Sequence, residues 1–214
     1  MGGAGPGPNG SHTWNSSDKS LLLSLSAADM TATAAYTNDY QIVRCTKNNL
    51  NTFNGGKPYW EILIDQIGVN NNKWYTGLVL SSPALVGGSL FYGYISIYAA
   101  YRINSQILND LNWFTDGEGP GQTGAALSSF ILRFALDIPS RKFFVGMNGV
   151  WMNSSNPVTG VTPSFYNMPE NMNFSPFFAT DSLQSVAPIV TLKSAVADFT
   201  YALPTGYTTL DGSS

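Results

Sequence analysis

Few residues in this sequence carry side chains that could do chemistry. It has one histidine, His12, and one cysteine, Cys45, among its 214 residues. His12 follows a glycine-rich stretch and is far along the chain from any pair of carboxylates, so a Ser-His-Asp triad is not expected. One histidine and one cysteine cannot form a zinc site, and a single cysteine excludes an internal disulfide. Because free cysteine is usually buried, we expect Cys45 to lie in a core.

Paired carboxylates are the remaining route to catalysis, because a glycosidase needs two carboxyl groups roughly 5 to 10 Å apart. The candidate pairs are Glu61 with Asp65, Asp116 with Glu118, and Glu170 with Asp181. Asp116 and Glu118 lie in a stretch whose glycines indicate a solvated turn. A calcium ion could bind there with backbone carbonyls, although no EF-hand spacing supports it. We therefore predict no enzyme, no metal site and no cofactor.

The composition and charge limit the partners of the chain. Charged residues make up 11% of the sequence, against about 25% in an average soluble domain. The net charge is -3 and no cluster of lysine and arginine exists, so nucleic acid is not an expected partner. The longest apolar runs are too short to cross a bilayer, and no leader follows Met1. We expect a protein outside the cytoplasm or packed into an assembly, without membrane insertion.

The first twelve residues, MGGAGPGPNGSH, hold no side chains that could form a core. Glycine and proline at this density predict an extended arm over residues 1–12. Such an arm docks on its own domain or on a neighbouring subunit, or it is a remnant of cloning. We interpret it as an assembly arm whose contacts are made by Gly5, Pro6, Pro8 and His12.

Residues 130 to 152 show the clearest local pattern. Apolar side chains alternate from Phe130 to Leu136, which predicts a strand with one buried face. Pro139 stands where a type I turn favours proline. A second strand over 142–147 then meets Asn148-Gly149, the strongest short hairpin signal. The pattern predicts a three-strand meander that returns at 150–152.

Short alternating runs predict further strands along the chain. They lie at 21–25, 30–34, 41–47, 59–66, 73–80, 89–101, 187–192 and 195–201. We expect 59–66 and 73–80 to pair as a hairpin across the tip 68–72. Residues 102–112 fit either a short helix or a strand. The expected loops are 36–40, 48–56, 81–88, 113–124 and 152–176, the last being the longest run without structure.

The meander resembles a known family. Ala-Leu-Asp at 135–137, the aromatic strand after it and the Asn-Gly turn before Trp151 are similar to the hallmark hairpin of SPRY (B30.2-like) domains. The stretches 57–64, 73–80 and 198–207 resemble other SPRY segments in the same order, although 198–200 reads Asp-Phe-Thr where Asn-Phe-Gly is usual. The resemblance implies an all-β, concanavalin-like antiparallel β-sandwich over 13–210, followed by a tail at 211–214. It also implies that Glu61 hydrogen-bonds the backbone.

Two flanking stretches, 13–19 and 151–160, resemble the SPRY versions of bacteriophage tail and virion proteins and of bacterial surface proteins. This implies a non-enzymatic component of a virion, such as a head-decoration, head-fibre or tail-fibre protein. Its partners would be other virion proteins, copies of itself (three-fold symmetry is common in fibres) and a glycan or protein of the host surface. The alternative is a freestanding adhesin module that binds carbohydrate or protein.

SPRY domains bind through loops at one end of the sandwich, where a rigid scaffold places recognition residues. The loops here with contact-capable residues are 36–40, 113–118 and 151–166. We predict ligand contacts from Trp113, Asp116, Glu118, Trp151 and Tyr166, because exposed aromatic residues suit both sugar stacking and protein contacts. The other tryptophans are expected in the core or in an interface; they are Trp14, Trp60 and Trp74.

Overall fold

The computed structural model describes residues 11–35, 41–50, 56–66, 73–81, 91–98, 102–109, 112–116, 129–166, 168, 173–181 and 188–213. Gly5, Pro6, Pro8 and Glu118 lie outside these ranges, as does the predicted loop 36–40. The described part of the chain consists of β-strands and two short 3-10 helices, η2 (Met152–Ser154) and η3 (Val196–Asp198). No helix among these residues is long and apolar enough to span a bilayer.

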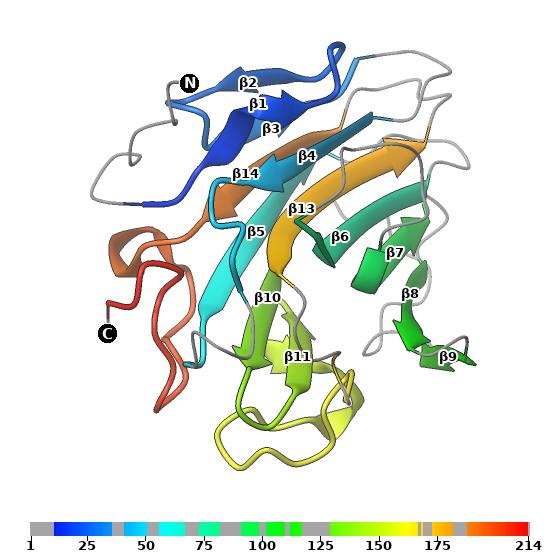
Figure 1. Cartoon of the computed structure of the whole chain (residues 1–214), viewed down its shortest axis with the longest axis vertical. Helices are drawn as coiled ribbons and strands as arrows, with labels where there is room; N and C mark the ends of the chain where they lie inside the picture. The colour runs from blue at the N-terminus through cyan, green and yellow to red at the C-terminus, as the bar shows by residue number, and fades with distance from the viewer. Residues whose placement is uncertain are drawn as a thin grey trace.

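Two seven-stranded antiparallel sheets form a sandwich (Figure 1). The first sheet has the order β1 (Trp14–Lys19), β4 (Gln41–Cys45), β13 (Phe174–Asp181), β6 (Lys73–Leu80), β7 (Phe91–Tyr98), β8 (Arg102–Asn109) and β9 (Asn112–Asp116). The second has the order β12 (Val150–Trp151), β11 (Lys142–Met147), β10 (Phe130–Asp137), β5 (Tyr59–Gln66), β14 (Ile189–Lys193), β3 (Thr31–Thr33) and β2 (Ser24–Ser26). The predicted all-β antiparallel sandwich is confirmed.

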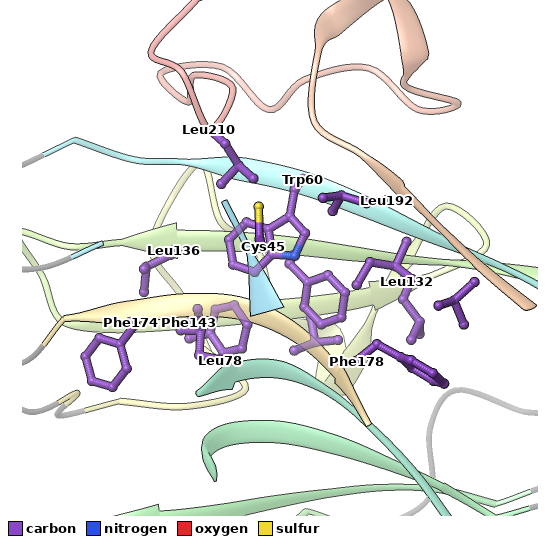
Figure 2. Packing of buried hydrophobic residues seen from close by; sticks show 14 of the residues in the cluster. Cys45, Trp60, Leu78, Leu132, Leu136, Phe143, Phe174, Phe178, Leu192 and Leu210 are labelled. Atoms are coloured by element: carbon purple, nitrogen blue, oxygen red, sulfur yellow. The ribbon is translucent and has the colours of Figure 1, made fainter. Parts of the chain in front are cut away.

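The core lies between the two sheets and is built on stacked aromatic rings (Figure 2). Trp60 stacks on Phe134 and Phe143 at centroid distances of 5.2 and 5.8 Å, and Phe165 stacks on Phe143 at 5.5 Å. Each fully buried ring of this kind contributes roughly 2 to 3 kcal/mol through burial. Cys45 is fully buried in the same core, which raises the pKa of its thiol to about 12. The predicted burial of Cys45, Trp14 and Trp60 is confirmed; the side chain of Trp74 is outside the description.

The predicted meander is confirmed. β10 pairs with β11, and β11 with β12, in antiparallel register. The Arg141 amide donates to the Ile138 carbonyl at 3.1 Å and closes the first turn. Asn148 and Gly149 have φ values of 45° and 85°, as a type I′ turn requires. At Gly149 a Cβ would lie 2.9 Å from the Tyr201 ring, so glycine is needed there for space as well.

The predicted hairpin of 59–66 with 73–80 is wrong, because these strands belong to different sheets. β5 pairs with β10 and β14, whereas β6 pairs with β13 and β7. Neighbours in sequence pair only as a tendency, in about two-thirds of cases. Here the chain crosses from one sheet to the other between β5 and β6, and each strand finds partners from distant parts of the sequence.

The predicted strand over 21–25 is also largely wrong. Leu21 and Leu22 occupy a turn, and the side chain of Leu21 is 97% exposed. Bonds at both ends of this turn hold it: the Ser20 amide donates to the Ile42 carbonyl at 2.8 Å, and the Lys19 ammonium donates to the Leu23 carbonyl at 2.6 Å. The strand β2 therefore begins only at Ser24.

Other boundaries differ from the prediction where tertiary pairing extends or replaces local structure. Residues 113–116 belong to β9, so Trp113 and Asp116 lie in a strand and not in a loop. Residues 102–109 form the strand β8, so of the two alternatives, a short helix or a strand, the strand is correct. Residues 174–176 belong to β13. The predicted strand at 195–201 is irregular chain around η3.

The outer face of the second sheet is covered, which the alternating pattern of β10 did not predict. Arg133, Ala135 and Asp137 are buried although they face away from the main core. The C-terminal segment, residues 194–213, packs over them, and a separate apolar cluster joins this segment to the sheet. Its members are Tyr59, Ala135, Phe144, Tyr207, Trp151, Phe199 and Leu203.

The buried carboxylate of Glu61 anchors this segment. It accepts hydrogen bonds from the Thr200 amide at 2.8 Å, the Tyr201 amide at 3.0 Å and the Tyr59 hydroxyl at 2.6 Å. The Arg133 guanidinium donates to the same hydroxyl at 3.1 Å. The prediction that Glu61 binds backbone is confirmed. Asp65 is exposed and lies four residues along the strand, about 13 Å away, beyond the separation used by a glycosidase.

We predict that Glu61→Gln lowers the free energy of unfolding by about 2 kcal/mol, because an amide replaces one acceptor oxygen with a donor that faces backbone N–H groups. Urea unfolding followed by fluorescence measures the change. Asp65→Asn, on the same strand but exposed, is the matched control and should change stability little. Equal effects of the two substitutions would contradict the anchoring role of Glu61.

Candidate binding surface

Residues 152–166 form a loop with its own internal order, although the sequence predicted no structure there. After η2, Asn156 and Val161 exchange backbone hydrogen bonds of 3.0 and 3.2 Å and close a tight turn. The Asn156 side-chain oxygen accepts the amides of Val158 and Thr159 at 2.9 and 3.2 Å. Gly160 completes the turn at a φ of 72°. We call residues 152–166 the braced loop.

Contacts with the sandwich hold the braced loop in place. The Lys142 ammonium donates to the Gly160 carbonyl at 2.8 Å, and the Tyr207 hydroxyl donates to the Pro157 carbonyl at 3.3 Å. Phe165 and Phe143 exchange backbone hydrogen bonds of 2.8 and 2.9 Å, so the end of the loop extends the sheet beside β11. The loop is therefore fixed at its tip, residues 157–160, and at Phe165, where the chain returns to the sheet.

The braced loop presents apolar side chains to solvent. Val158 is 52% exposed, Val161 is 56% exposed and Tyr166 is 47% exposed. The loop lies at the lower end of the molecule in Figure 1, beside the β10–β11 turn and opposite β1 to β3. Rigid apolar groups favour binding, because little conformational entropy is lost when a partner covers them.

Trp151 directly precedes the braced loop, and its side chain is half-buried against the sandwich. The Arg133 guanidinium lies 4.3 Å from the centroid of the Trp151 ring and 4.9 Å from that of the Tyr201 ring. Arg133 also donates to the Gly149 carbonyl at 3.1 Å. Cation–π contacts of this kind fix the indole and leave one part of it accessible. Trp151 thus positions the start of the loop.

The structure brings only some of the predicted binding residues together. Trp151 and Tyr166 lie at the two ends of the braced loop, whereas Trp113 and Asp116 lie in β9, in the other sheet. Glu118 falls outside the described residues. A ligand-binding role for all five stays a prediction. Among the described residues, no group of three histidine, cysteine, aspartate or glutamate side chains could hold a metal ion.

Sequence reasoning missed the exposed valines and the groups that fix the loop. Asn156-Pro157 is a turn-initiating pair, so the turn itself could have been found from the sequence. The contributions of Lys142 and Tyr207 carry no local signal, because the two residues lie outside the loop, 18 and 50 positions along the chain from the groups that they bind. The exposure of Val158 depends on these distant contacts.

His12, predicted as part of an assembly arm, contacts its own domain. Its Nδ1 lies 3.2 Å from the Thr46 hydroxyl oxygen, and its carbonyl accepts the Ser194 hydroxyl at 2.7 Å. The preceding Ser11 hydroxyl donates to the Asp198 carboxylate at 3.3 Å. Burial, reinforced by the nearby Lys47, lowers the pKa of His12 against a smaller opposing effect of Asp211. The end of the arm is thus latched to the sandwich with a neutral histidine.

Solved structures that are similar to this chain include two SPRY domains and a toxin. The SPRY domain of human HERC1 matches with a TM-score of 0.56 and 12% sequence identity, over 88% of this chain and 99% of that chain. The TRIM65 PSpry domain matches with a TM-score of 0.50 and 13% identity, over 85% and 89%. Stonustoxin matches with a TM-score of 0.52 and 16% identity, over 90% of this chain but 29% of that chain.

The chain therefore has a SPRY-like fold, and the resemblance seen in the sequence is confirmed at that level. No protein-family model matches the sequence. No curated protein matches it either. The bacteriophage part of the resemblance stays a prediction.

We predict that His12 makes the latch sensitive to acid. Its folded-state pKa is lowered, so the unfolded chain binds more protons at and below about pH 6.5. The latch is fully stabilising above that pH and weakens as the pH falls through it towards the lower folded-state pKa. His12→Gln keeps a hydrogen-bonding side chain without this titration. The free energy of unfolding of the wild type should fall more than that of His12→Gln between pH 7.5 and pH 5, and identical pH profiles would contradict the prediction.

Proposed function

We propose that this chain is a non-enzymatic binding module that recognises a protein through the braced loop. The observation that carries the proposal is a loop fixed by Lys142 and Tyr207 that holds Val158 and Val161 exposed. The two valines at the loop tip bury well against other apolar side chains but, unlike Tyr166 at the end of the loop, offer no ring on which a sugar can stack. They favour a protein partner over a glycan.

We further propose that the module is a structural component of a bacteriophage virion, in its head or its tail, and that the partner is a host-surface protein. The resemblance of residues 13–19 and 151–160 to virion and tail proteins supports this, and residues 151–160 include the tip of the braced loop. The low share of charged residues, 11%, suits a protein packed among other subunits. Copies of this chain, in trimers, and other virion proteins would be its assembly partners.

The binding part is tested with a double substitution, Val158→Asp with Val161→Asp. Two charges at the loop tip should weaken binding of the labelled protein to intact bacterial cells about tenfold or more, because each half-exposed valine can contribute roughly 1 kcal/mol on burial. Leu21→Asp is the matched control, since Leu21 is an exposed apolar residue in the turn between β1 and β2, and these strands lie opposite the braced loop in Figure 1. Unchanged binding of the double variant, or competition by free sugars, would contradict the proposed protein partner.

The assembly part is tested by the mass of the protein in solution, measured by light scattering with and without residues 1–10. This truncation leaves the latch contacts of Ser11 and His12 in place. We expect a trimer or larger species that dissociates when the arm is removed. A monomer that is indifferent to the truncation would contradict an assembly role and would favour a freestanding adhesin.

A further inference from the structure

A cleft of about 300 Å³ lies between residues 47–50 and 56–58 on one side and the C-terminal segment on the other. Its volume is at the lower end of the range for small-molecule sites. Leu50, Ile138 and Leu210 line it, and all three belong to the main core. The cleft thus has an apolar floor whose position is fixed by the packing of the sandwich.

One wall of the cleft is a turn that satisfies its own polar groups. The Thr209 amide donates to the Ser213 carbonyl at 2.7 Å, and the Ser213 amide donates to the Thr209 hydroxyl at 3.0 Å. Asp211 accepts hydrogen bonds from the Thr209 hydroxyl and from the Ser213 amide. Burial opposes ionisation of Asp211, but these bonds outweigh it and lower its pKa. Asp211 therefore stays ionised at neutral pH.

The wall is also joined to β5. The Tyr59 amide donates to the Thr208 carbonyl at 2.7 Å, and the Thr208 amide donates to the Lys57 carbonyl at 2.9 Å. These two bonds hold the backbone of Thr208 at the edge of the cleft. Within the described part of the chain Thr208 hydrogen-bonds only through its backbone, so its hydroxyl can donate to a ligand.

Lys47 lines the same cleft and differs from the other lysines whose side chains are described. Those have partners: Lys19 binds the Leu23 carbonyl, Lys57 pairs with Asp137, Lys142 binds the Gly160 carbonyl and Lys193 binds the Thr200 hydroxyl. The ammonium of Lys47 makes no ion pair or hydrogen bond with the described residues, although the residue is half-buried. A cation that has no ion-pair partner can pair with an incoming anion.

We propose that this cleft binds a small carboxylate, whose apolar body packs on Leu50 and Leu210 and whose anionic head pairs with Lys47. The Thr208 hydroxyl would donate a second hydrogen bond to the head. Asp211 on the rim repels an anion in proportion to its charge, so it disfavours phosphate more than it disfavours a carboxylate. Both a free organic acid and the C-terminal carboxylate of a partner peptide have this chemistry. The site is independent of the braced loop.

Calorimetric titration of the full chain with hexanoate and with hexanamide tests the proposal. Hexanoate should bind saturably, and its uncharged analogue should bind at least tenfold more weakly. Lys47→Met keeps the apolar stem and should lose at least tenfold in hexanoate affinity. Lys193→Met is the control, because it removes an equal charge away from the cleft, and it should bind like the wild type.

A short peptide that ends in leucine, tested as the free acid and as the amide, separates the two sources of the carboxylate. Tighter binding of the free-acid peptide than of hexanoate assigns the site to a chain terminus, and the reverse order assigns it to a small acid. Equal binding of hexanoate and hexanamide, no binding of either, or full affinity in Lys47→Met would overturn the proposal. Thermal unfolding of each variant verifies that the fold is intact.

Discussion

The buried carboxylate of Glu61 holds the C-terminal segment on the sandwich. It satisfies two backbone amides of the C-terminal segment, at Thr200 and Tyr201, and so fastens that segment across the outer face of the second sheet. A buried charge is stable only when its hydrogen bonds are complete. Because the segment supplies them, strands that would otherwise face water on one side are buried on both, and Phe199 packs edge-on against Tyr59 at 4.9 Å.

A chain of contacts leads from Glu61 to the braced loop. Tyr201 is placed by its bond to Glu61, and its ring lies against the Arg133 guanidinium, which in turn lies against Trp151 at the start of the loop. Further along the same segment, Tyr207 holds the loop tip through Pro157. The C-terminal segment therefore both stabilises the fold and positions the surface that we propose for binding. A partner would meet a loop that is already ordered.

Local sequence patterns predicted the parts of the fold that local physics decides. The turn at Asn148-Gly149 follows from backbone dihedral preferences, and the burial of Trp60 and Cys45 follows from hydrophobicity. The separation of β5 and β6 into two sheets could not be predicted in this way, because strand pairing depends on contacts between distant segments. The braced loop was missed for the same reason: Lys142 and Tyr207 act on it across the fold. The candidate site was thus located by the family resemblance, but its exposed valines were not.

The proposed binding surface requires that the braced loop is ordered before any partner binds. Backbone amide hydrogen exchange of the free protein tests it most directly, at Val161, which donates to the Asn156 carbonyl at 3.2 Å, and at Phe165, which donates to the Phe143 carbonyl at 2.9 Å. We expect both amides to exchange slowly, within the range found for β11. Exchange of both at the rate of an unstructured peptide would contradict a preformed binding surface.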